Sequence, residues 1–184
     1  MKWHLNSAQA VYVRGASDAA ATPTRLRRSD DFLQFDFFGE LQARFDATIA
    51  LDDAAPPLLA VAGSHRLPKH ALLVSEASSA LPISLAKGDV LLSAGHTLTA
   101  FGPPESGAGG SFLCSSYSPA YLCEEELQIL SNPPELARTY PIALQRLCGW
   151  MIYGGSLGYW GSRQHPVEAY DLKPVDFAAT RHRL

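Results

Sequence analysis

Between residues 10 and 117 the sequence alternates short apolar runs with turn residues. In the clearest run, 41–50, four apolar residues alternate with Arg44, Asp46 and Thr48. A period of two is typical of a strand with one face in the core and the other in water. Similar short runs lie at 10–14, 32–38, 58–62, 70–75, 81–85, 89–93, 97–101 and 111–117. Each is too short for a stable helix, so this region is predicted to be mainly β, a sandwich or barrel.

Turn residues separate these predicted strands. The runs 32–38 and 41–50 flank Gly39-Glu40, which indicates a hairpin. The polar stretch 15–31 and the glycine-rich stretch 102–110 are predicted to be loops. Asp52-Asp53 is explained most simply as part of a charged loop.

The pattern becomes helical after residue 117. Three glutamates open the run 123–130, where acidic residues suit the first turn of a helix. A spacing of three and four predicts a second helix over 139–153, with Gly154-Gly155 as its C-cap. We therefore predict a β domain with a C-terminal helix over 1–155. An extended tail with aromatic and proline residues follows at 156–184.

Composition narrows the class of protein. The 184 residues are 47% hydrophobic and carry a net charge of -3, so the chain should fold, and sequence-independent nucleic-acid binding has little support. Neither a signal peptide nor an apolar run long enough for a membrane span occurs. Three cysteines without a CxxC unit favour a reducing compartment. A cytoplasmic protein without nucleic-acid or membrane partners is expected.

One segment carries a resemblance to a known superfamily. LPISLAKGDVLLSAGHTLTAF, at 81–101, resembles the second motif of the cupin superfamily, in which Gly88-Asp89 would form the tight turn between two strands. The flanking segments 70–80 and 111–140 are similar to the sensor cupin of AraC-type transcription regulators. The two helix-turn-helix units of those regulators need about a hundred residues, more than follow Gly155. The resemblance therefore implies a sensor-like cupin without its DNA-binding module.

The cupin metal ligands are not reproduced in this sequence. His65 and His70 are five residues apart, whereas two ligands on one face of a strand need an even separation. Leu98 stands at the position where the second motif of the superfamily has its histidine. We therefore expect no metal and no other cofactor. The predicted function is small-molecule binding by a non-metal sensor-type cupin without activity of its own.

The ligand is expected between the β faces, beside a small set of strand residues: His70, Leu72, Leu98, Phe112 and Cys114. Two alternatives make the protein an enzyme. One is a metal-dependent cupin with an unusual ligand set, namely His65, His70, Glu76 and His96. The other is a cysteine hydrolase with Cys114 as nucleophile, although a small buried thiol explains this residue more simply.

Aromatic residues gather after the second predicted helix, at Trp150, Tyr153, Tyr159 and Trp160. Exposed together, they predict a homodimer, because so large an apolar patch is rare on a monomer. Core packing is the equal alternative. A pure interaction module, with the tail as contact surface, is a third class of function.

Overall fold

The computed structural model describes residues 3–14, 25–30, 43–68, 79–104, 109–153, 155–159, 161 and 163–170. The chain separates into two compact units, one of residues 8–116 and the other of residues 1–7 and 117–184. Strands dominate and the helices are short, so the predicted mainly β, cupin-like class is confirmed. The domain boundary near residue 155 stays a prediction.

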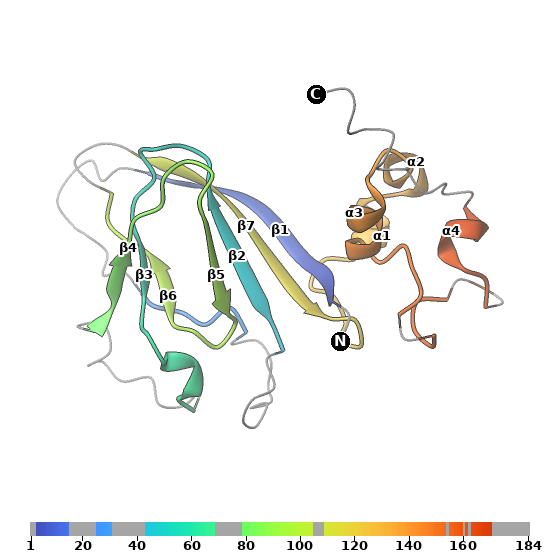
Figure 1. Cartoon of the computed structure of the whole chain (residues 1–184), viewed down its shortest axis with the longest axis horizontal. Helices are drawn as coiled ribbons and strands as arrows, with labels where there is room; N and C mark the ends of the chain where they lie inside the picture. Colours follow the sequence, from blue (N-terminus) through green and yellow to red (C-terminus); the bar gives the residue numbers. More distant parts are fainter. Residues whose placement is uncertain are drawn as a thin grey trace. The chain divides into compact units, whose positions relative to one another are not determined.

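The strands form two sheets (Figure 1). The larger has the order β1 (Trp3–Val13), β7 (Gly110–Pro119), β2 (Phe45–Ala50), β5 (Val90–Ala94). The smaller has the order β4 (Leu81–Ile83), β3 (Leu58–Ala60), β6 (Thr99–Phe101), and β3 pairs antiparallel with both neighbours. The described strands make a two-sheet sandwich rather than a closed barrel.

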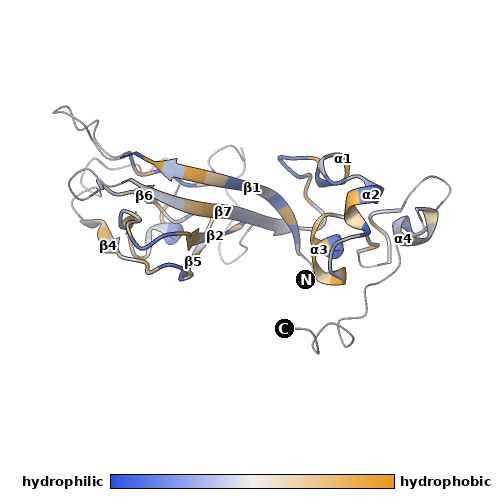
Figure 2. Cartoon of the chain, turned by 90° about the horizontal axis from the view of Figure 1, so that it is seen from above, coloured by the Kyte–Doolittle hydropathy of each residue, from blue (hydrophilic) through white to orange (hydrophobic). Residues whose placement is uncertain are grey.

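A small apolar core joins strands of the two sheets. Ala50, Leu58 and Phe112 are buried in it, and the rings of Phe101 and Phe112 lie 5.0 Å apart. Figure 2 shows the hydrophobic stretch in the middle of β7 that contributes to this core. The alternation in the sequence thus produces the sandwich by burying one face of each strand.

β2 does not divide cleanly into an apolar and a wet face. Thr48 lies opposite Leu91 of β5, and Leu91 packs on the core together with Ala50 of β2. Asp46 and Thr48 share the face of Ala50 and are half-buried rather than fully wet. On the face predicted to be apolar, Ala47 is buried but Phe45 is exposed, so the predicted division holds only in part.

Most predicted strands are confirmed, with shifted ends. The first begins at Trp3 rather than at residue 10. The runs 32–38 and 70–75, and the hairpin at Gly39, lie outside the described residues.

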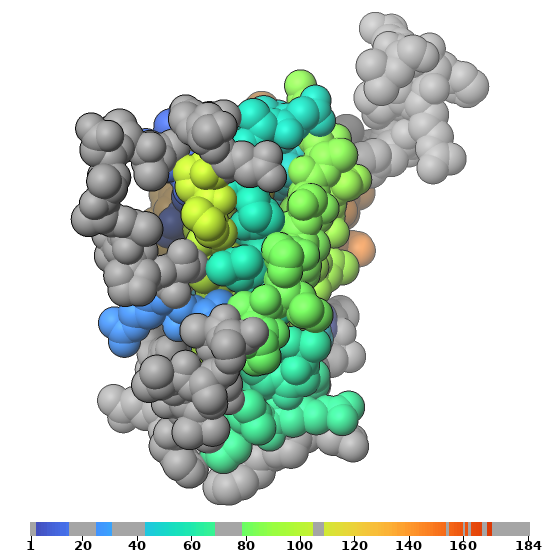
Figure 3. Space-filling model, turned by 90° about the vertical axis from the view of Figure 1, so that its left-hand side faces the viewer, coloured from blue at the N-terminus to red at the C-terminus, as the bar shows by residue number. Residues whose placement is uncertain are grey.

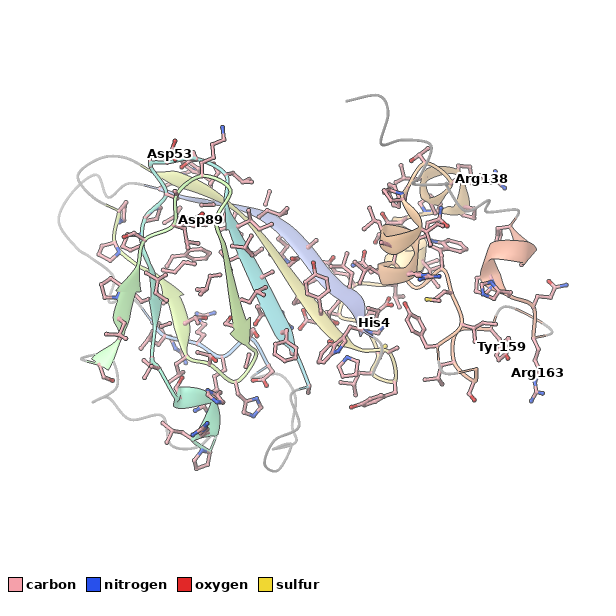
Figure 4. The ribbon with its side chains drawn as sticks, in the orientation of Figure 1. His4, Asp53, Asp89, Arg138, Tyr159 and Arg163 are labelled. Atoms are coloured by element: carbon pink, nitrogen blue, oxygen red, sulfur yellow. The ribbon has the colours of Figure 1, made fainter. Side chains whose placement is uncertain are left out.

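The predicted tight turn at Gly88-Asp89 is confirmed. Gly88 has a φ of 90°, which glycine adopts at little cost, and Asp89 accepts the N–H of Ala86 at 3.0 Å. Asp53, on the loop after β2, accepts the N–H of Lys87 at 3.0 Å. Figure 4 labels both aspartates on their loops. Asp53 and Asp89 therefore fix loop backbones in this unit.

The helices of the other unit are shorter than predicted: α1 (Gln128–Ser131), α2 (Pro134–Ala137), α3 (Ile142–Leu147) and α4 (Pro166–Ala169). The helix predicted over 139–153 ends early, because Gly149 adopts a φ of 83° and reverses the chain. The N–H of Gly149 bonds the carbonyl of Arg146, and that of Trp150 bonds the carbonyl of Gln145. These two bonds make a Schellman motif at Gly149 rather than a cap at Gly154-Gly155.

A second core lies inside this unit and is built from four buried residues: Leu5, Ala137, Cys148 and Trp150. Trp150 is 1% exposed and its indole N–H donates to the carbonyl of Asn132 at 3.0 Å. None of the described helices is long and apolar enough to cross a membrane.

The predicted aromatic patch is divided between core and surface. Trp150 and Tyr153 are buried, Tyr159 is 41% exposed (Figure 4), and Trp160 lies outside the described residues. The first two therefore follow the core alternative and cannot be part of an exposed patch. The homodimer itself stays a prediction.

Candidate functional site

Three segments of residues 8–116 meet at a polar cluster inside this unit. Arg27 pairs with Thr99 at the start of β6, and the N–H of Ser29 donates to the carbonyl of Gly95 at 3.1 Å. The N–H of Gly95 donates to the carbonyl of Arg44, just before β2, at 2.9 Å. Figure 3 shows the segment 25–30, in blue, beside the yellow-green β6. Backbone bonds thus bring together residues far apart in the sequence.

Asp30 and His96 form the centre of this cluster. Nδ1 of His96 contacts Oδ2 of Asp30. Asp30 is fully buried, whereas 14% of the His96 side chain is exposed. A carboxylate at Nδ1 favours the tautomer with its proton on that nitrogen, which leaves Nε2 as an acceptor. No hydrogen bond to Nε2 is found among the described residues.

Asp46 carries a second polar contact set beside this pair. Its Oδ1 accepts Nε of Arg44 at 2.9 Å, and its Oδ2 accepts the hydroxyl of Ser29. Both side chains of the ion pair are at most one-fifth exposed. Asp46 therefore has a cationic partner, and Ser29 connects it to the segment that carries Asp30.

Arg28 is the other buried cation of the cluster and is only 3% exposed. Its Nη1 donates to the carbonyl of Pro68 at 3.2 Å, and its Nη2 donates to the carbonyls of Ser64 and Leu67 at 3.4 and 3.3 Å. These carbonyls surround the short helix η1 (Ser64–Arg66). Nε of Arg28 is buried without a hydrogen-bond partner among the described residues.

Of the five predicted ligand-binding residues, three are described. Phe112 and Cys114 belong to the same core cluster, whereas Leu98 is buried where its N–H donates to Oγ of Ser64 at 2.9 Å. His70 and Leu72 lie outside the described residues. Burial raises the pKa of Cys114, although a bond to Thr48 opposes the shift. A raised pKa keeps the thiol protonated, which does not support a cysteine hydrolase.

Only two of the four residues predicted as alternative metal ligands are described. His65 lies in η1, His96 bonds Asp30, and His70 and Glu76 lie outside the described residues. Among the residues that the structure describes, no three His, Cys, Asp or Glu side chains are grouped to hold a metal ion.

The sequence pattern does not identify Arg28, Ser29 and Asp30 as site residues, because they fall in a stretch that is predicted to be a polar loop. Arg28 and Asp30 are nevertheless buried, whereas Arg27 is exposed. The burial of these two charged side chains depends on contacts with residues far along the chain, which a local pattern does not report.

The other unit contains a separate buried cluster. Nδ1 of His4, which is labelled in Figure 4, lies 3.4 Å from Oε1 of Glu124. The rings of His4 and Tyr153 are almost perpendicular, with 6.4 Å between their centroids. Burial lowers the pKa of His4 and raises that of Glu124. Burial and the nearby Glu124 raise the pKa of Cys148 to about 11 and that of Tyr153 to about 12. At neutral pH both Cys148 and Tyr153 are therefore uncharged.

His4 is expected to make the protein less stable in mild acid. The folded protein binds a proton at His4 less readily than the unfolded chain, so this stability is complete above the ordinary pKa of 6.5 and is lost as the pH falls below it. The raised pKa of Glu124 acts in the opposite sense, since its protonation favours the folded protein. Melting temperatures from about pH 8 to about pH 5 should fall for the natural protein and fall less for His4→Gln. Parallel curves for the two proteins would contradict the assignment.

No protein-family model matches this sequence, and no curated protein is similar to it. Solved structures do resemble it. The non-heme alpha ketoglutarate dependent epimerase SnoN from nogalamycin biosynthesis matches with a TM-score of 0.51 and 18% identity, over 64% of this chain and 50% of SnoN. The non-heme monooxygenase ThoJ, in its nickel complex, matches with a TM-score of 0.49 and 16% identity, over 67% of this chain and 47% of ThoJ. AviO1 from Streptomyces viridochromogenes Tue57 matches with a TM-score of 0.47 and 18% identity, over 66% and 53%.

These comparisons correct the functional prediction. The chain shares its fold with SnoN and spans about half of that protein's length. SnoN, which shares this fold, is an epimerase, and this contradicts the prediction of a sensor without catalytic activity. The mainly β, cupin-like fold stands, and the similarity to AraC-type sensors finds no support among these structures. The enzyme alternative agrees better with SnoN.

Proposed function

We propose that this protein is an enzyme that transfers a proton to or from a small molecule, with His96 as the base and Asp30 as its partner. The observation that carries the proposal is the contact between a fully buried carboxylate and a partly exposed imidazole, which lies on the turn between β5 and β6. An enzyme of the same fold, SnoN, is described as a non-heme alpha ketoglutarate dependent epimerase, which supports an enzymatic role but not a particular mechanism.

His96 and Asp30 have distinct roles in this proposal. Nε2 of His96 takes the proton of the substrate, and the imidazolium that forms keeps its other N–H on the carboxylate of Asp30. Burial of Asp30 strengthens this interaction, because the charge that develops on the ring is stabilised in a region of low dielectric constant. The pair alone is expected to supply about 10²–10⁴-fold of rate enhancement.

The metal of a non-heme enzyme does not fit the described residues. Such enzymes hold the ion with two histidines and one carboxylate. Here Asp30 and His96 supply one of each but bond to one another, and no third described ligand is grouped with them. The predicted ligands His70 and Glu76 lie outside the described residues. In our proposal the proton transfer runs through His96, and the metal-dependent alternative is distinguished from it by the test below.

Exchange of hydrogen for deuterium tests the proposal without knowledge of the substrate. The protein is incubated in D₂O with separate 2-hydroxy acids, 2-oxo acids and aldoses, and deuterium at carbon is measured by mass spectrometry. We expect enzyme-dependent incorporation into at least one compound, unchanged by EDTA. Incorporation or turnover that requires iron(II), or iron(II) with alpha ketoglutarate, would instead support the metal-dependent alternative. Absence of exchange under every condition would contradict both.

A further inference from the structure

Arg28 is a buried cation without a carboxylate partner among the described residues. Its contacts are to three backbone carbonyls, and no described acidic side chain pairs with it. By contrast, the neighbouring buried Arg44 has Asp46 at 2.9 Å. Arginine is rarely this buried without an anion, because removal of a charge from water costs several kcal/mol. An anion bound next to Arg28 would therefore stabilise its buried charge.

The guanidinium of Arg28 still has donors to offer. It carries five N–H groups and makes three carbonyl bonds, which leaves two, one of them the buried Nε–H. A buried donor without an acceptor costs about 1–3 kcal/mol. An anion at Nε would remove this cost and balance the charge in one contact.

Arg28 lies two residues before Asp30, and both side chains are buried, whereas Arg27 is exposed. Ser64 also connects Arg28 to the opposite segment, since its carbonyl accepts Nη2 of Arg28 and its hydroxyl accepts the N–H of Leu98, two residues after His96. Arg28 thus belongs to the surroundings of the proposed base.

We propose that Arg28 binds the carboxylate group of a small molecule beside His96. That this molecule is the substrate rests on the proposed function, whereas the binding itself does not. A carboxylate fits better than a phosphate, because one buried positive charge balances one negative charge and a phosphate carries up to two. Asp46 is paired with Arg44, and the side chain of Asp30 contacts His96 rather than Arg28.

Calorimetric titration of the full chain with lactate and with lactamide tests the proposal. The two probes have nearly the same shape, but only lactate carries the carboxylate. At constant ionic strength we expect saturable binding of lactate and at least tenfold weaker binding of lactamide. The Arg28→Gln variant should lose about ten- to a hundredfold in lactate affinity, the range for a hydrogen bond to a charged group. Inorganic phosphate is titrated as the third probe.

Arg27→Gln is the matched control, because it removes the same charge from the adjacent, exposed position and should leave the lactate affinity unchanged. If Arg28→Gln does not fold, the proposal is tested with Arg28→Lys and with the comparison of lactate and lactamide on the natural protein. Equal binding of both probes, tighter binding of phosphate, or full affinity in the Arg28 variant overturns the proposal. These outcomes do not depend on turnover. Lactate binding in a protein without deuterium exchange would refute the proposed function and leave Arg28 as an anion site.

Discussion

Replacement of His96 by Asn is expected to lower the rate of deuterium exchange by about 10²–10⁴-fold and to leave the fold intact. Asn keeps a donor near Asp30 but has no nitrogen that can accept a proton at the position of Nε2. Because Asn is only slightly smaller than His, the change leaves only a small cavity. The measurement is the initial rate of deuterium incorporation into the compound that exchanges with the natural protein. Circular dichroism shows whether the fold is retained.

Two further variants test whether the loss is specific to the pair: Asp30→Asn changes the partner of His96, and His165→Asn is a control outside the cluster. The carboxamide of Asp30→Asn can stabilise the wrong tautomer of His96, so exchange should fall by a similar factor while the ring remains in place. His165 lies in the other unit and its replacement should leave the rate unchanged. Full activity in the His96 variant would refute the acid–base role. Loss of activity in His65→Asn as well would favour the metal-dependent ligand set.

The local features of the β unit could be predicted because they depend on neighbours in sequence. Alternation over 41–50 is sufficient to locate β2, and the pair Gly88-Asp89 is sufficient to locate a tight turn. The burial of individual side chains of β2 could not be read from the same pattern. A polar face usually means water, but Asp46 bonds Arg44 and Ser29 and is half-buried, which depends on how distant segments pack.

The candidate site could be predicted only in fragments for the same reason. His96 was named as an alternative metal ligand, but its partner Asp30 is 66 residues away and follows three arginines in a segment that resembles a loop. Only the pairing of residues 27–29 with 95–99 brings the two side chains together. A long-range contact of this kind leaves no local signal in a single sequence.

In the helical region the predicted helix is longer than the observed one, because the apolar spacing continues beyond the end of the helix. Apolar spacings continue from Leu144 to Trp150, but Gly149 takes a positive φ and ends α3 after Leu147. The spacing reports which side chains are buried, and burial continues through the turn. Trp150 is buried after the helix has ended.

Replacement of Trp150 by Ala is expected to lower the free energy of unfolding by about 3–5 kcal/mol, the range for a large buried aromatic residue. The side chain is 1% exposed, packs against the edge of Tyr170 with 5.4 Å between ring centroids, and donates its indole N–H to Asn132. Removal leaves a cavity among Leu5, Ala137 and Cys148, which the short helices around it can fill only in part. Chemical denaturation of the full chain measures the loss.

Two further variants separate packing from surface effects. Trp150→Phe keeps most of the apolar volume and should cost less than Ala, the lost hydrogen bond accounting for about 1 kcal/mol. Tyr159→Ala, at an exposed position, should change stability by about 0.5 kcal/mol or less. Sedimentation of Trp150→Ala at several protein concentrations distinguishes a core residue from an interface residue. A core residue lowers stability at every protein concentration, whereas an interface residue changes the balance of monomer and dimer. A change in the monomer–dimer equilibrium without a loss of stability would instead support Trp150 as a residue of the predicted dimer contact.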